Sequence, residues 1–146
     1  KMPIYLGGEM EVVSLSPNAP GEKPRVLIVD DEESIREVLQ ILLPRQGFEV
    51  TTVSDGLEAV ECYKTARVDG CPFAVVILDL TVPGGVGGKE TLALLRAIDP
   101  QVRTIVVSGF AGGRADEEFR SMGFTDAVAK PFQVQDLAEV IRRNLP

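Results

Sequence analysis

Several short apolar stretches of this 146-residue chain end in a residue whose side chain suits metal or phosphoryl chemistry. These residues are Asp30 with Asp31, Asp79, Ser108 and Lys130. Carboxylates placed close together repel one another, and a hard divalent cation with oxygen ligands relieves that repulsion. If the fold gathers these residues, we expect a Mg²⁺ site in which Asp30, Asp31 and Asp79 supply oxygen ligands.

The same residues suit the transfer of a phosphoryl group. A carboxylate is a competent nucleophile toward phosphorus, and a metal ion together with a lysine can neutralise the oxygens of the transferring group. Asp79 is the predicted nucleophile, because it follows six apolar residues that indicate a buried central strand. We expect Lys130 to act as a point charge on the phosphoryl group and the Ser108 hydroxyl to sense that group through a hydrogen bond.

Strands and helices that alternate along the chain must position these side chains. The predicted strands cover residues 25–29, 48–53, 73–78, 103–107 and 125–129. Three of them are nearly continuous apolar runs, which is typical of strands buried on both faces of a parallel sheet. Five such units with right-handed crossovers predict an α/β fold, a (βα)5 doubly wound parallel sheet of flavodoxin-like order 2-1-3-4-5. In such sheets, function sits beyond the carboxyl ends of the strands.

Apolar residues at helical spacing mark the helices between these strands. They are Ile35, Val38, Leu39, Leu42 and Leu43 in the first helix, and Val134, Leu137, Ala138 and Ile141 in the last. Each stripe should cover one face of the sheet. We expect Asp55 with Gly56 to start the second helix, Asp99 to end the third and Gly123 to cap the fourth. Phe119 and Met122 on the fourth helix are predicted to be core residues.

The strand ends resemble the receiver-domain motifs of two-component signalling. The motifs are Val29-Asp30-Asp31-Glu32, Ile77-Leu78-Asp79-Leu80 followed by Pro83 and Gly84, Ser108-Gly109, and Lys130-Pro131-Phe132. The resemblance covers roughly residues 25–145 and fixes residue types at four separate strand ends in the right order. It is therefore more specific than a match to one short motif.

This resemblance implies a phosphoacceptor domain that catalyses only its own phosphorylation and dephosphorylation. Asp79 would accept the phosphoryl group from a histidine kinase or a histidine phosphotransfer protein. The backbone carbonyl of Thr81 would join Asp30, Asp31 and Asp79 as a Mg²⁺ ligand. Ser108 would be the switch hydroxyl and Lys130 the lysine of the site. Phosphorylation would switch the face formed by the fourth helix, fifth strand and fifth helix, and a weak homodimer through that face is expected.

Two features depart from the common receiver pattern. Ala127 stands three residues before Lys130, where receivers often carry the aromatic ring that swings inward on activation. The loop after Asp79, glycine-rich over residues 83–88, is one residue longer than the common form. This glycine-rich variant resembles receivers fused to hybrid histidine kinases.

The start of the chain carries a second resemblance to those kinases. Residues 1–6 are similar to the last strand of a kinase ATP-binding domain. We expect residues 1–24 to be a linker, because residues 14–24 are rich in Pro, Ser, Asn and Gly, and residues 25–146 to be the receiver domain.

Three other interpretations stay open at this point. Asp30 and Asp31 are also compatible with a helix N-cap pair that has no further role. A haloacid-dehalogenase-like phosphatase also uses a strand-end Asp, Mg²⁺ and a Lys, but it needs a second Asp where this chain has Thr81. An unphosphorylated pseudo-receiver that serves as a docking module fits the fold, although such modules usually lose some of the acidic or lysine residues.

Composition excludes several further classes of function. The formal net charge of −7 argues against a nucleic-acid-binding surface. The chain has no histidine, which excludes His-based triads, most zinc sites and an autophosphorylating histidine. Cys62 and Cys71 lack metal-ligand spacing and are interpreted as plain thiols. Because no apolar run of about 18 residues occurs, we expect no membrane insertion by this segment and a cytoplasmic location.

Overall fold

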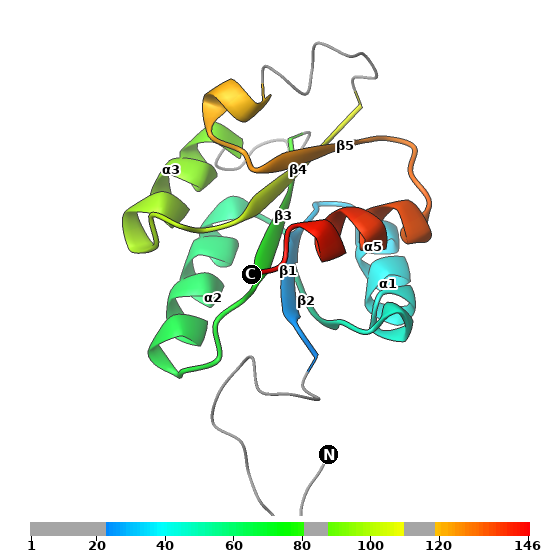
Figure 1. The fold of residues 1–146 in the computed structure, drawn as a ribbon, viewed down its shortest axis with the longest axis horizontal. Coiled ribbons are helices and arrows are strands. Elements are labelled where there is room, and N and C mark those ends of the chain that lie inside the picture. The colour runs from blue at the N-terminus through cyan, green and yellow to red at the C-terminus, as the bar shows by residue number, and fades with distance from the viewer. Residues whose placement is uncertain (1–22, 81–87, 110–118) are drawn as a thin grey trace, which may run out of the picture.

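A five-stranded parallel sheet forms the centre of the protein in a computed structural model, which describes residues 23–80, 88–109 and 119–146. The strands are β1 (Arg25–Val29), β2 (Glu49–Val53), β3 (Val75–Asp79), β4 (Thr104–Ser108) and β5 (Asp126–Ala129). Their order is β2-β1-β3-β4-β5 (Figure 1). The predicted fold class and strand order are confirmed.

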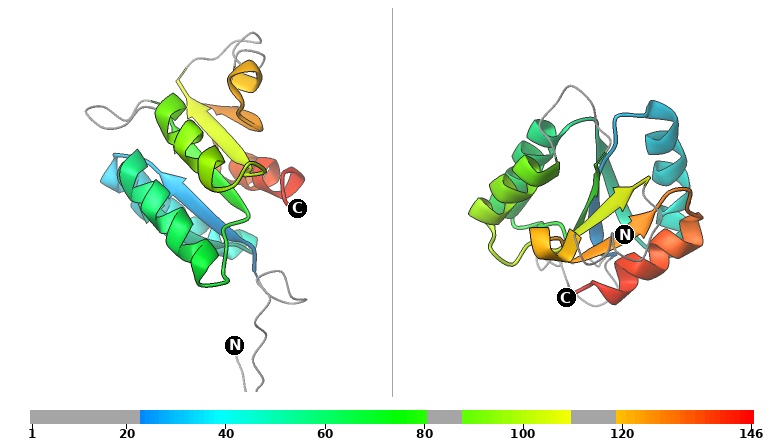
Figure 2. Two further views of the ribbon diagram at one scale, coloured as in Figure 1. Left: turned by 90° about the vertical axis from the view of Figure 1, so that its left-hand side faces the viewer. Right: turned by 90° about the horizontal axis from the view of Figure 1, so that it is seen from above.

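Helices cover both faces of this sheet. They are α1 (Glu33–Leu42), the short 3-10 helix η2 (Pro44–Gln46), α2 (Gly56–Val68), α3 (Gly88–Ile98) and α5 (Val134–Arg143). Residues 119–122 are also helical, where the fourth helix is predicted; residues 110–118 lie outside the described ranges. Seen from above, the sheet lies between α2 and α3 on one side and α1 and α5 on the other (Figure 2, right).

The alternation of side chains along β1 shows how one strand contributes to both layers of the core. Val26 and Ile28 pack in the cluster that contains residues of α1 and α5, whereas Leu27 and Val29 pack in the cluster under α2 and α3. All four are buried. Because successive strand residues point to opposite faces, a strand covered on both sides must be apolar throughout.

Helix boundaries follow the predicted capping residues. The Asp55 carboxylate accepts a hydrogen bond of 2.8 Å from the Glu58 N–H and caps α2, which begins at Gly56. The third helix ends at Ile98, directly before Asp99. Gly123 follows the helical residues 119–122 with φ +107°, a left-handed conformation that favours glycine. These three expectations are confirmed.

Strand bounds and one helix residue differ from the sequence predictions. Strands β2, β4 and β5 begin one residue later than predicted and β3 begins two residues later, while β3 and β4 each end one residue later. Phe48 and Phe73 are buried although they precede the first ladder pairs. Val38 is 47% exposed, although its spacing predicted a place against the sheet. The apolar face of α1 that packs on the sheet is formed by the buried Leu39, together with Leu43 directly after the helix. Val38 lies at the solvent edge of this face.

Candidate functional site

Asp30 and Asp31 lie directly after β1, at the carboxyl edge of the sheet. The Asp30 N–H donates to the Val53 carbonyl at 3.1 Å, and its carboxylate Oδ1 accepts a 2.9 Å hydrogen bond from the Glu32 N–H. Asp30 is buried, whereas Asp31 is exposed. Glu32, and neither aspartate, is the N-cap residue of α1. The N-cap interpretation of this pair is therefore wrong, and Asp30 instead braces the turn that leads into the helix.

Asp79 is the last residue of β3, which pairs with β1 on one side and β4 on the other. Its side chain is only 2% exposed and forms an ion pair of 2.8 Å between Oδ2 and Nζ of Lys130. Burial of an unpaired carboxylate is costly, so the contact with the lysine is what makes this position tolerable in the folded protein.

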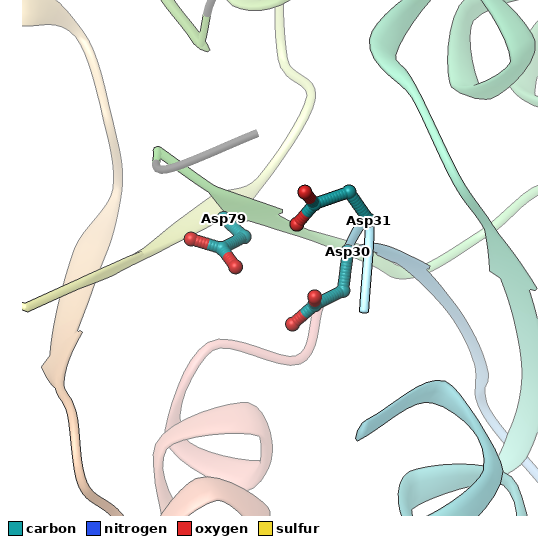
Figure 3. A group of neighbouring side chains, drawn as sticks. All are labelled: Asp30, Asp31 and Asp79. Atoms are coloured by element: carbon teal, nitrogen blue, oxygen red, sulfur yellow. The ribbon is translucent and has the colours of Figure 1, made fainter. Parts of the chain in front are cut away.

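The three aspartates form one cluster. Each offers a carboxylate oxygen within 4.8 Å of the others. Figure 3 shows Asp30 and Asp31 leaving the end of β1 and Asp79 leaving β3, with their carboxyl groups close together. These side chains, predicted to be metal ligands from separate parts of the sequence, are thus brought together by the β1–β3 pairing.

Electrostatics at the cluster reflect its excess of negative charge. Burial, assisted by the negative charge of Asp79, raises the pKa of Asp30 to about 6, although the Glu32 N–H and Lys130 act in the opposite direction. Burial alone would lower the pKa of Lys130, but its hydrogen bond to Asp79 and the nearby Asp30 raise it above its usual value. Lys130 therefore stays charged and compensates only part of the cluster.

This donor set fits a hard divalent cation. It consists of carboxylate oxygens, two of them on buried residues, and three carboxylates face the single ammonium of Lys130. Mg²⁺ takes oxygen ligands and usually keeps part of its water shell, so three carboxylates and few other groups suffice. Thr81, whose carbonyl is the fourth predicted ligand, lies outside the described residues.

Ser108 ends β4, next to this cluster in the sheet. Its neighbour Val107 is in register with Asp79, and Ser108 itself is in register with Ala129. The Ser108 carbonyl accepts a 2.8 Å hydrogen bond from the Lys130 N–H. The main chains that carry the predicted switch hydroxyl and the predicted lysine are therefore directly connected, and Ser108 is buried.

Ala127, on β5, occupies the position at which receivers often carry an aromatic ring. It is half-buried and packs against the cluster that contains Phe119 and Phe124, whose rings meet edge to face with centroids 6.2 Å apart. Phe119 is buried and Met122 is partly buried, so their prediction as core residues is confirmed.

One residue near the site was not predicted. The Arg36 guanidinium, on α1, donates a 2.7 Å hydrogen bond to the backbone carbonyl of Asp30. The available sequence signal was a basic residue close to the amino end of a helix, where the helix dipole disfavours positive charge. The sequence does not identify the acceptor of this arginine.

Comparisons with known proteins agree with this geometry. Residues 26–142 match the family described as response regulator receiver domain. The chain is 32% identical over 120 residues to the chemotaxis protein CheY of Thermotoga maritima. The match covers 82% of this chain and 95% of that protein. The high-resolution structure of the chemotaxis response regulator CheY4 of Vibrio cholerae has a TM-score of 0.73 and 29% identity, and the match covers 84% of this chain and 99% of that chain.

A further solved structure bears on the metal. The receiver domain of the sensor histidine kinase PA1611 of Pseudomonas aeruginosa contains a magnesium ion coordinated in its active-site cleft. It has a TM-score of 0.70 and 25% identity, and the match covers 83% of this chain and 96% of that one.

Some relatives are much longer than this chain. It spans 52% of the transcriptional regulatory protein YkoG of Bacillus subtilis and 18% of the sensor kinase/phosphatase CqsS of Vibrio cholerae. Within the described ranges, none of the helices has the length and apolar character needed to cross a membrane.

Proposed function

Because the chain belongs to the response regulator receiver domain family of two-component signalling, we propose that Asp79 accepts a phosphoryl group from a phosphohistidine of a partner protein. The partner would be a histidine kinase or a histidine phosphotransfer protein. The observation that carries the proposal is the 2.8 Å contact between Lys130 and the buried Asp79, inside a cluster of three carboxylates at the carboxyl edge of the sheet.

The proposed step is a displacement at phosphorus. A carboxylate oxygen of Asp79 forms the new P–O bond while the P–N bond to the donor imidazole breaks, and the imidazole leaves with the bonding electron pair. The product is an acyl phosphate on Asp79. Lys130 already lies beside this carboxylate, so its ammonium is placed to neutralise charge on the phosphoryl oxygens without a large movement.

The metal would be held by Asp30, Asp31 and Asp79, together with the carbonyl proposed at Thr81. Mg²⁺ bound there supplies positive charge to the phosphoryl oxygens and lowers the repulsion between an incoming phosphoryl group and the carboxylates. The fit of the carboxylates to an oxygen-binding cation supports this part of the proposal.

Signal output would begin at Ser108 and Lys130. A phosphoryl group on Asp79 offers new acceptors for the Ser108 hydroxyl and the Lys130 ammonium, and the two residues are linked through the main chain. The change would pass to the face formed by the helix that contains residues 119–122, β5 and α5. With Ala127 at the half-buried position on β5, that face would respond without a ring on this strand.

The domain is proposed to be a signalling module that catalyses only its own phosphorylation and dephosphorylation and acts on no separate substrate. Whether it acts alone or within a hybrid histidine kinase concerns the whole protein, and the similarity to CqsS, which is a sensor kinase/phosphatase, supports the second arrangement.

Intact-mass spectrometry after incubation with acetyl phosphate and Mg²⁺ tests the proposed function. A single phosphoryl adduct is expected, absent from D79A and absent when EDTA is present. If wild type forms no adduct under conditions in which Mg²⁺ binding is measured, the phosphoacceptor function is wrong and a docking module becomes the better description.

A further inference from the structure

Arg36 contacts the candidate metal site through the main chain. Its Nη1 lies 2.7 Å from the carbonyl oxygen of Asp30, six residues earlier in the chain. The side chain is half-buried and projects from the first turns of α1 toward the end of β1. A hydrogen bond from a charged donor at this distance is a strong one.

The bond acts on a peptide group that both aspartates share. The carbonyl of Asp30 belongs to the planar peptide unit that continues to the nitrogen of Asp31. Fixing that carbonyl therefore fixes the orientation of the whole unit and the direction in which both side chains leave the main chain. Two other hydrogen bonds also hold Asp30. Its N–H donates to the Val53 carbonyl, and its carboxylate accepts from the Glu32 N–H.

We propose that Arg36 is a positioning residue for the acidic pair, because it holds the Asp30–Asp31 peptide in the orientation that presents both carboxylates to Mg²⁺. This inference rests on the proposed function, since it assumes that the cluster binds Mg²⁺. The Arg36 guanidinium bonds to the Asp30 main-chain carbonyl and not to the carboxylate of Asp30, so its effect on the metal passes through the main chain. Groups that orient metal ligands in this way typically change metal affinity 10- to 100-fold when removed.

The sign of the effect separates positioning from simple charge. A guanidinium close to the cluster repels a metal cation, so loss of its charge alone would strengthen Mg²⁺ binding. Loss of positioning weakens binding, because the carboxylates must then be ordered at the moment the metal binds. The two explanations predict opposite changes for the same substitution.

Arg142 offers a matched control. Its Nη2 donates a 3.1 Å hydrogen bond to the backbone carbonyl of Gln46, so it is also an arginine on a helix that holds a main-chain oxygen. Gln46 belongs to η2, which precedes β2 and lies at the opposite edge of the sheet from the aspartates. R142A removes the same kind of bond and the same charge without touching the site.

Titration calorimetry of the whole chain with MgCl₂ tests the inference, and it suits a protein that has no tryptophan to report binding by fluorescence. We expect R36A to raise the Kd for Mg²⁺ about 10-fold or more, R36K to recover part of the loss, and R142A to match wild type. Unchanged or tighter binding by a folded R36A would overturn the positioning role. If R36A does not fold, R36K decides: binding as tight as wild type from its different donor geometry would overturn the role.

Phosphorylation by acetyl phosphate gives a second readout. Because Arg36 orients the metal ligands and does not touch the reacting atoms, R36A should need more Mg²⁺ for half-maximal rate yet reach the wild-type rate at saturating Mg²⁺. A lowered rate at saturation would contradict the inference. Absence of Mg²⁺ binding by wild type is a separate result, which would refute the proposed function and the positioning role with it.

Discussion

Lys130 and Asp79 are 51 residues apart in sequence, yet Nζ of the lysine lies 2.8 Å from Oδ2 of the aspartate. The contact joins the ends of β3 and β5, which are separated in the sheet by β4. Since the Lys130 N–H also bonds to the Ser108 carbonyl of β4, three strand ends are connected around one carboxylate. A chemical change at Asp79 therefore has a direct path to β4 and β5.

Replacement of the lysine should separate phosphorylation from its structural consequence. In K130A, the Asp79 carboxylate and the metal ligands are retained, so we expect the acetyl phosphate adduct still to form. The chemical-shift changes at β5 and α5 that accompany phosphorylation of wild type should be largely lost, because the ammonium that connects Asp79 to the end of β5 is gone. Backbone amide NMR spectra before and after phosphorylation measure this effect.

The matched control is K64A, which removes an exposed lysine from α2 and should respond as wild type does. A K130A protein whose β5 and α5 resonances shift as in wild type would show that Lys130 has no coupling role.

The pH dependence of stability should reveal the cost of ionising the buried Asp30 carboxyl group in metal-free protein. Its folded pKa, about 6, lies above the ordinary 3.8, so the folded state binds this proton more tightly than the unfolded state does. The contribution of this group to the free energy of unfolding is therefore highest below pH 3.8 and is lost as the pH rises through about 6, by an amount of about 3 kcal/mol.

D30N removes that titration while keeping an oxygen acceptor for the Glu32 N–H. We expect D30N to be more stable than wild type at pH 7 in EDTA, with a gap that closes toward pH 4. Urea denaturation at both pH values measures the gap, and an equal gap at the two values would contradict the assignment of the shift to Asp30.

Mg²⁺ should reverse the instability that the carboxylates cause. A ligand that binds only the folded state adds about 2.7 kcal/mol of stability at 100 times its Kd. The thermal midpoint of wild type should rise with MgCl₂ and return to its starting value with EDTA, whereas D79N should show little response. D69N, which changes an exposed carboxylate at the end of α2, should respond as wild type does; a full response by D79N would place the metal elsewhere.

A third buried aspartate, Asp126, should stabilise the start of β5. Burial by itself would raise its pKa, but hydrogen bonds of 2.8 Å from Nε of Arg143 and 2.8 Å from the Asn144 amide bring the pKa below its usual value. Its contribution to stability is therefore present above the unfolded pKa and is lost as the pH falls through the lower folded pKa.

D126N should cost about 1–2 kcal/mol of unfolding free energy at pH 7, because the amide cannot accept both donors as the carboxylate does. The charge part of this loss is limited by the exposure of the Arg143 side chain, which is 58% accessible. Urea denaturation should show the difference between D126N and wild type shrinking as the pH is lowered toward 3. A difference that is independent of pH would rule out the ionised Asp126 as its source.

Much of the site followed from the sequence because its residue types stand at the ends of apolar runs. A parallel sheet brings carboxyl ends of strands to one edge, so Asp30, Asp79 and Lys130 were predicted to meet without knowledge of the coordinates. Strand order was also predictable, because right-handed crossovers leave few arrangements of five βα units.

Other features depended on tertiary geometry that a linear pattern does not encode. The acceptor of Arg36 is a main-chain oxygen six residues earlier in the chain, which the folded turn between β1 and α1 brings within reach. Val38 has the spacing of a core residue, but α1 buries Leu39 and leaves Val38 at the solvent edge of its apolar face. Phe48 contributes to the core although it precedes the first paired residue of β2.

The central claim is that Asp79 carries the phosphoryl group, and its most direct test is to identify the modified residue. Phosphorylated protein is treated with borohydride, which reduces an aspartyl phosphate to homoserine, and the residue is located by tandem mass spectrometry. The account predicts homoserine at position 79 in wild type, dependent on Mg²⁺, and none there when the phosphodonor is omitted. Homoserine at another aspartate, or an unmodified position 79 in protein that carries the adduct, would contradict it.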